Sequence, residues 1–137
     1  MFKYLFISIV FLSSINHACS QVIETSTRST KGYIKSSGII EDSQHSTVGY
    51  IKSDGTIENS SHQTIGYIKN NGAIENSSRS TVGYVKEDGT VENSSRRTIG
   101  YVTDEGRVED SSHSTIGFAS GVKKEWAAVV YFFFNFN

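Results

Sequence analysis

The seventeen residues from Thr47 to Gln63 read TVGYIKSDGTIENSSHQ, and this stretch decides the fold because the chain repeats it. Full copies cover residues 30–46, 47–63, 64–80, 81–97 and 98–114, and half copies cover 22–29 and 115–120. A fixed period without insertions is the signature of a repeat architecture. The marker of each copy is a glycine followed by an aromatic residue, at Gly32-Tyr33, Gly49-Tyr50, Gly66-Tyr67, Gly83-Tyr84, Gly100-Tyr101 and Gly117-Phe118.

Each copy reads as a β-hairpin, because two short segments rich in β-branched and aromatic residues flank a glycine turn. A two-residue turn would place Ile51 opposite Glu58. A three-residue loop over 53–55, with the glycine left-handed, places Ile51 opposite Ile57, so that both aliphatic side chains share one face. We therefore predict the three-residue loop, with Tyr50 opposite Glu58 on the other face and Lys52 diagonal to that glutamate.

The hairpins are expected to form an all-β closed ring, propeller-like or flower-like in shape. A hairpin of this size buries too little apolar area to stand alone, so the five copies must share a core. Open repeat stacks usually end in atypical capping copies, and neither end of this chain carries one. The two half copies suit closure, since the first and last strands can meet. Whether they form a sixth hairpin or only seal a ring of five stays open.

The N-terminus is typical of a signal peptide covering residues 1–20. Lys3 precedes an apolar run, and a small polar stretch ending in Ala18-Cys19-Ser20 offers a cleavage site. This predicts a mature domain over 21–137 that is secreted, periplasmic or held at the cell envelope. The alternative is a lipoprotein anchored through Cys19, although Asn16 occupies the position where such signals usually carry leucine.

The C-terminal apolar segment, residues 122–137, breaks the repeat. Residues 127–134 are all apolar or aromatic, which is far short of the roughly 20 residues of a membrane-spanning helix. The run predicts a buried strand or a short core segment. We expect it, together with Trp126, to pack in or over the centre of the ring. The alternative is an exposed strand that binds a partner.

The repeated motif T-[IV]-G-Y-[IV]-K-x-[DN]-G-x-[IV]-E-[ND]-S-S and the ending Lys-Glu-Trp-Ala-Ala followed by phenylalanines resemble a known family. These are the five-fold β-flower proteins, small secreted bacterial proteins, and the resemblance spans residues 22–137. It implies five petals around an axis and brings no established activity. The fifth copy departs most from the motif, with Thr103 in place of lysine and Glu105-Gly106 at the turn.

The charged residues recur as rings. The formal net charge of −1 gives no reason to expect nucleic acid as a partner. The glutamates of the repeat are expected to form exposed ion pairs with the lysines rather than a calcium site. A further series alternates histidine and arginine, which predicts a basic surface ring rather than zinc, because arginine cannot bind the metal. The members of that series are Arg28, His45, His62, Arg79, Arg96 and His113.

The function expected from these patterns is non-catalytic. The same residues recur in every copy, whereas catalysis needs unlike groups at one place, so we predict neither an enzyme nor a cofactor or metal. The candidate ligand-binding residues are the repeated tyrosines, although tyrosine also suits packing between petals with its hydroxyl at the rim. The expected ligand is a glycan or another cell-envelope polymer. The alternative is a structural protein that binds a protein partner or itself through its aromatic C-terminus. The tyrosines are Tyr33, Tyr50, Tyr67, Tyr84 and Tyr101.

Overall fold

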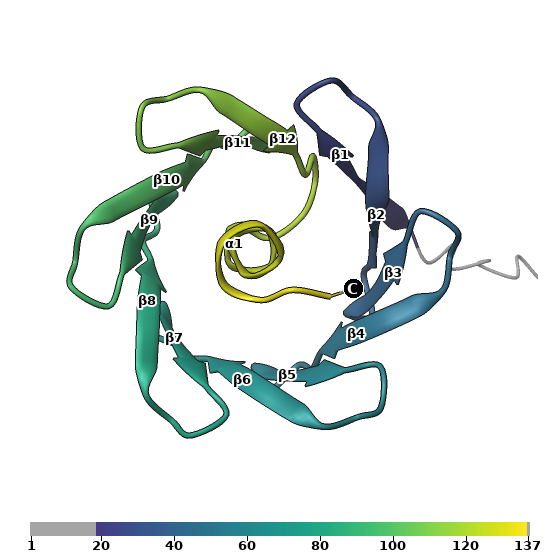
Figure 1. Cartoon of the computed structure of the whole chain (residues 1–137), viewed down its shortest axis with the longest axis horizontal. Coiled ribbons are helices and arrows are strands. Elements are labelled where there is room, and N and C mark those ends of the chain that lie inside the picture. The colour runs from purple at the N-terminus through teal and green to yellow at the C-terminus, as the bar shows by residue number, and fades with distance from the viewer. Residues whose placement is uncertain (1–18, 137) are drawn as a thin grey trace, which may run out of the picture.

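The computed structural model describes residues 19–136, and these form one closed antiparallel barrel around a short central helix (Figure 1). Each strand pairs with its neighbours in the chain, and β12 pairs with β1 to close the circle. The all-β class and the closed ring are thereby confirmed, as a continuous barrel rather than the separate blades of a propeller. The twelve strands are β1 Ser20–Thr25, β2 Thr30–Lys35, β3 Ile39–Asp42, β4 Thr47–Ile51, β5 Thr56–Asn59, β6 Thr64–Ile68, β7 Ala73–Asn76, β8 Thr81–Val85, β9 Thr90–Asn93, β10 Thr98–Val102, β11 Arg107–Asp110 and β12 Thr115–Phe118.

The described strands build six petals, one more than the family resemblance implied. Each petal joins the second strand of one copy to the first strand of the next, so the first petal is β1–β2 and the last is β11–β12 (Figure 1). Each of the five glycine turns connects one petal to the next. Five such connections join six petals. The half copies supply the missing strands: β12 pairs with β1 through Phe118 opposite Glu24, as Tyr50 pairs with Glu58 inside a full copy. They therefore form a sixth two-stranded unit whose strands come from opposite ends of the chain.

The predicted hairpin register is confirmed. Tyr50 lies opposite Glu58 and Ile51 opposite Ile57. The Lys52 and Gly55 amides close the three-residue loop by donating to Thr56 and Lys52 carbonyls, at 2.8 and 3.0 Å. Gly55 has a φ of +90°, which glycine adopts without the steric penalty of a Cβ. Because the loop has three residues, both isoleucines face inward.

The inward aliphatic side chains form the core of the barrel. The first strand of each copy contributes residues such as Ile34 and Ile51, and the second strand contributes residues such as Ile40 and Ile57, all at most 3 % exposed. Burying one such side chain contributes about 1.5–3 kcal/mol. A single hairpin holds only two of them, so the ring is the smallest unit that can be stable.

Every petal contains a β-bulge, and the glycine beside it lies close to the backbone of the strand on its other side. Between β5 and β6, Ile57 pairs with Gly66 and Glu58 with Thr64, which leaves Ile65 as the extra residue. A Cβ on Gly66 would overlap the Glu75 carbonyl oxygen on the other neighbouring strand. The glycine of the Gly-aromatic pair is therefore required by this close approach, and it presents bare backbone to the centre of the ring.

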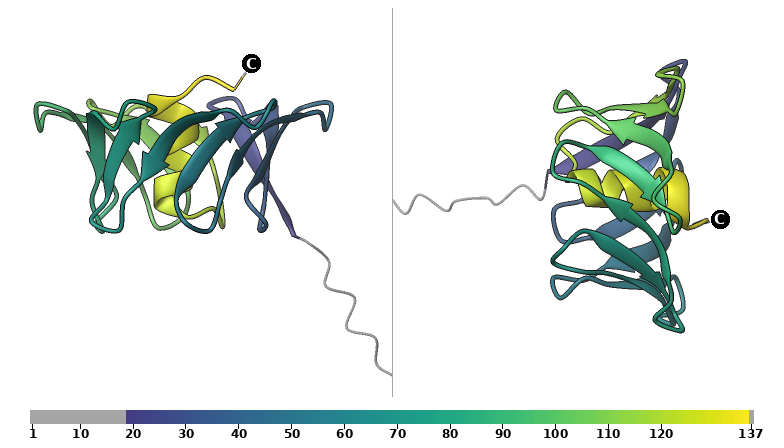
Figure 2. Two further views of the ribbon diagram at one scale, coloured as in Figure 1. Left: turned by 90° about the horizontal axis from the view of Figure 1, so that it is seen from below. Right: turned by 90° about the vertical axis from the view of Figure 1, so that its left-hand side faces the viewer.

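The C-terminal segment forms a helix, so the buried strand, one of the two forms expected for it, is wrong there. An α-helical turn, α1 Lys124–Ala128, continues into a π-helical turn, η1 Val129–Phe133. Figure 2 shows it rising through the ring from the narrow rim toward the rim where the petal loops flare outward. Ala127, Ala128 and Val129 are fully buried. The apolar run contains no polar residues, so the spacing of polar positions cannot distinguish a helix from a strand. The enclosed interior of the ring favours the helix, which is the more compact of the two.

The aromatic side chains after Val130 lie against successive petal glycines. A Cβ added to Gly83 would overlap the Phe133 ring, and one added to Gly66 would overlap the Phe134 ring. The same holds for Phe132 at Gly100 and for Phe136 at Gly49. Each glycine thus leaves the space that one aromatic ring occupies, a region that we call a glycine slot.

The expected signal peptide, residues 1–20, lies outside the described residues except for its last two. Ser20 already belongs to β1, where it pairs with Lys35, and Cys19 is exposed. Within residues 19–136, no helix combines the length and the apolar character needed to cross a membrane.

We predict that Gly83→Ala destabilises the fold more than Gly32→Ala does, by about 1–3 kcal/mol, the usual cost of overpacking a core. At both positions the new methyl group meets a glutamate carbonyl, but only at Gly83 does it also meet an aromatic ring. Urea denaturation of the two variants measures the difference. In a Phe133→Ala background the added loss caused by Gly83→Ala should fall to that caused by Gly32→Ala, and equal losses in the two single variants would contradict the slot.

Candidate functional site

The outer face of each copy carries a cluster of one aromatic ring, one cation and one carboxylate. In the copy at 47–63, Tyr50 and Glu58 lie opposite each other because the three-residue loop sets that register. Lys52, just beyond β4, places its Nζ 3.1 Å from Glu58 Oε1, as the diagonal pairing predicted.

The petal loop returns a second nitrogen-bearing side chain to the same cluster. The Asn59 side chain accepts hydrogen bonds of 3.0 Å from the amides of Ser61 and Gln63, which folds the loop back on itself. His62 then takes a φ of +61°, in the left-handed region where non-glycine residues are uncommon. Its imidazole stacks on Tyr50, with centroids 4.3 Å apart and 19° between the rings, and its Nδ1 lies 3.0 Å from Glu58 Oε2. The side-chain contacts thus offset the backbone cost of the loop.

The same arrangement recurs with histidine or arginine at the left-handed position. His45 and His113 stack on Tyr33 and Tyr101 at 4.1 and 4.2 Å. Where the residue is arginine, its guanidinium carbon lies 3.4–3.5 Å from the ring centroid, a cation–π contact. These pairs are Arg28 on Phe118, Arg79 on Tyr67 and Arg96 on Tyr84.

Four of the six glutamates of these clusters are buried rather than exposed, which corrects the expected surface ion pairs. Glu41, Glu58, Glu92 and Glu109 are 5–8 % exposed, under the stacked rings and the lysine or arginine side chains. Hydrogen bonds from Lys35 and His45 lower the pKa of Glu41, and those from His62 and Lys52 lower the pKa of Glu58. Since a carboxylate only accepts, Nδ1 of each histidine is assigned as the donor.

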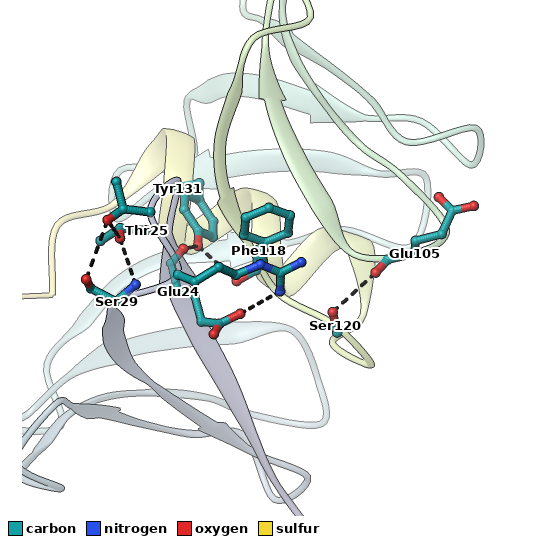
Figure 3. Close-up of polar contacts among 9 residues, drawn as sticks. Glu24, Thr25, Ser29, Glu105, Phe118, Ser120 and Tyr131 are labelled. Atoms are coloured by element: carbon teal, nitrogen blue, oxygen red, sulfur yellow. Dashed lines mark hydrogen bonds and ion pairs between the residues drawn. The ribbon is translucent and has the colours of Figure 1, made fainter.

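The sixth cluster is made by the two ends of the chain and holds the barrel closed (Figure 3). The Arg28 guanidinium lies over the Phe118 ring and 2.9 Å from Glu24 Oε2. On the inner side, the Tyr131 hydroxyl donates to the carbonyls of Glu24 and Phe118, at 2.5 and 3.1 Å, and so bridges β1 and β12. Burial raises the pKa of Tyr131 to about 12, so the hydroxyl keeps the proton that it donates.

Two hollows lie at equivalent positions between neighbouring units. One, of about 220 Å³, is lined by Tyr67 and Arg79 together with Asp54 and Thr56 of the preceding copy. The other, of about 270 Å³, has Tyr101, His113 and Asp88 in the corresponding places, two repeats further on. Each combines part of a tyrosine with a carboxylate and with the histidine or arginine of the petal loop.

The structure keeps the candidate tyrosines in separate clusters, one to a petal, rather than on one continuous surface. All five are half-buried, and one face of each ring is covered by the residue from the petal loop. The histidines are likewise separated, and no three potential metal ligands gather anywhere in residues 19–136.

The stacking on the tyrosines was missed by the sequence reasoning. Its signal was the alternation of histidine and arginine at one repeat position, since both side chains are planar and carry N–H donors.

Comparison with protein families agrees with this geometry. The model of the family described as "5-fold beta-flower protein" matches residues 20–135. The chain belongs to this family. No curated protein and no solved structure matches the chain. The β-flower match covers all twelve strands and the central helix, so the petal clusters and the hollows lie within the matched region.

We predict that Glu58→Gln removes a pH-dependent contribution to the stability of this β-flower. The pKa of Glu58 lies below its ordinary value of 4.5 in the folded state, so the folded chain binds fewer protons than the unfolded chain in that range. The stabilisation is complete above about pH 4.5 and is lost as the pH falls through the folded-state pKa. Denaturation at a series of pH values should show wild type and variant converging in acid.

Glu87→Gln is the matched control, because the exposed Glu87 side chain makes no ion pair in the structure. A difference between wild type and Glu58→Gln that stays constant from pH 7 to pH 3 would contradict the assignment.

Proposed function

We propose that this β-flower is an exported, non-catalytic binding module that holds a cell-surface or extracellular glycan through several equivalent weak sites. The observation that carries the proposal is the pair of hollows at Tyr67 and Tyr101. Their equivalence under the repeat places the same kind of recess at two positions that are two repeats apart.

The lining of the hollows suits a sugar. A pyranose ring presents C–H groups that pack on an aromatic side chain and hydroxyls that bond to carboxylates, amides and cations. The hollow at Tyr67 offers Asp54 and Asn70 as acceptors and Arg79 as a donor. The loop residue covers one face of the tyrosine, so the sugar would meet the part of the ring that lines the hollow.

Repetition compensates for shallow sites. A polymer that occupies one hollow is held close to the next, so its overall affinity rises without any strong single site. The clusters that line the hollows repeat the same groups in every copy, which supports binding rather than catalysis. Export rests on the signal-peptide pattern of residues 1–20, with lipid anchoring through Cys19 as the alternative.

We predict that Tyr67→Ala/Tyr101→Ala weakens binding to a polysaccharide recognised by the wild type about five- to hundred-fold, from roughly 0.5–1.5 kcal/mol per ring. A panel of cell-wall polysaccharides and peptidoglycan, tested by pull-down and titration calorimetry, measures the change. Tyr67→Phe/Tyr101→Phe is the matched control and should keep most of the affinity, since Phe118 occupies the same position in the sixth cluster. Absence of binding to the panel by the wild type, or equal binding by the alanine variant, would refute the glycan proposal.

We also propose that the C-terminal aromatic segment is the core of the ring rather than a surface for association. The support is the set of contacts between its rings and the petal glycines, together with the fully buried Ala127, Ala128 and Val129. Lys124 adds an ion pair of 2.6 Å with Asp104 and a hydrogen bond of 3.1 Å to the Glu87 carbonyl. An association surface would leave these side chains free for a partner.

We predict that deleting residues 126–137 abolishes folding, because the ring then loses the side chains that fill its centre. Circular dichroism and size-exclusion chromatography of the truncated chain measure this, with Asn135→Ala, at an exposed position, as a control that should fold normally. A truncated chain that stays folded but loses self-association would support the assembly alternative instead.

A further inference from the structure

Five of the six glycine slots hold an aromatic side chain from the C-terminal segment, and the slot at Gly32 does not. The three atoms nearest to a Cβ on Gly32 would be backbone atoms of Glu41 and Asp42, whereas an aromatic ring is among the nearest neighbours of each other petal glycine. Around the barrel, the Gly32 slot lies between the one holding Tyr131 and the one holding Phe136. Among residues 19–136, it is therefore the place where the pattern of one ring per petal is incomplete.

A cavity of about 100 Å³ occupies this position. Its walls are mainly apolar and include Ile23, Val48, Val130, Phe134 and Phe136, and the bare backbone of Gly32 lies among them. An apolar cavity of roughly 150 Å³ is known to take up benzene, so a partly open cavity of this size suits one ring and nothing larger. The other five slots show that the surroundings of a petal glycine accept a planar aromatic group.

At the rim of the cavity, the bulge position of the repeat carries a charged residue instead of an uncharged one. The bulge residue of each other petal is aliphatic and packs on the core, but in the first petal it is Lys31. The Lys31 side chain is exposed, and its Nζ lies 5.0 Å from the centroid of Tyr131. The aliphatic residues at this position are Val48, Ile65, Val82, Ile99 and Ile116.

Two acidic residues also line the cavity, but both are engaged elsewhere. Glu41 pairs with Lys35 at 2.5 Å and with His45 at 3.0 Å. The Asp42 carboxylate accepts the amide hydrogens of Gln44 and Ser46, both at 2.9 Å. Lys31 makes no ion pair within residues 19–136, so its positive charge is the one available to a ligand.

We propose that the Gly32 slot binds a small carboxylic acid bearing a single aromatic ring. The ring packs against Gly32 between Phe136 and the neighbouring slot, and the carboxylate pairs with Lys31 at the rim. This site is separate from the hollows at Tyr67 and Tyr101 and does not depend on glycan binding.

Titration of the purified protein with three probes, followed by amide chemical shifts, tests the proposal. Phenylacetate has both features, benzyl alcohol keeps the ring without the charge, and cyclohexylacetate keeps the charge without the planar ring. Phenylacetate should saturate one site, with the largest shifts at Gly32, Val48 and Phe136, and the other two probes should bind more weakly.

Variants of Lys31 separate the contribution of the charge from that of the ring. Lys31→Ile restores the residue type of the other petals, and Lys31→Gln keeps the length of the side chain. Both should weaken phenylacetate binding at least about three-fold, as expected for loss of an ion pair near the surface, and leave benzyl alcohol unchanged. Lys69→Gln, at an exposed lysine distant in sequence, is the matched control and should have no effect.

Any of four outcomes would overturn the proposal. Two concern the probes: no saturable shift at Gly32, or equal affinity for phenylacetate and benzyl alcohol. A third is that neither Lys31 variant changes phenylacetate binding. The fourth is binding that appears only after deletion of Asn137, which lies outside the described residues, because Asn137 rather than a ligand would then be the occupant of the slot.

Discussion

The close approach of backbone to backbone at the petal glycines is the constraint on which this fold depends. Each glycine sits where a neighbouring strand's glutamate carbonyl leaves no room for a Cβ. The same missing side chain opens the slot that an aromatic ring of the C-terminal segment fills. One residue type therefore sets both the curvature of the barrel wall and the shape of what fits inside it. The turn glycines, at φ near +90°, serve the separate task of setting the register.

The hairpin register was predictable from the sequence because only one loop length puts two aliphatic residues on one face. The number of petals was not, since five repeated turns are compatible with five hairpins or with six petals joined by five links. The half copies contained the answer: Glu24 and Phe118 stand at the same motif positions as Glu58 and Tyr50. The helix at 124–133 escaped prediction because an unbroken apolar run has no periodicity, and its form depends on the space that encloses it.

The outer clusters show how a polar surface can be ordered by contacts among its own side chains. Stacking on the aromatic ring and the bond to glutamate hold His62 at a φ that its own backbone disfavours. In the sequence, the stacking was signalled only by the alternation of histidine and arginine at one repeat position. The candidate tyrosines could be named from the sequence, but their coverage by loop residues could not. The part of a tyrosine that remains accessible faces the recess between neighbouring copies of the repeat. The hollows, rather than the flat faces of the rings, are therefore the more informative guide to a binding site.

The seam between β1 and β12 has a consequence for how the chain reaches its native state. Glu24 must find Phe118, and Tyr131 must then bridge the two strands from inside. Contacts between such distant segments form slowly, since the entropy of closing a long loop is lost before the contact compensates for it. The side chains that fill the centre also come after all twelve strands in the chain. The early petals therefore have nothing to enclose when they emerge from the ribosome, and the ring cannot mature progressively from its N-terminus. Closure waits for the C-terminal segment.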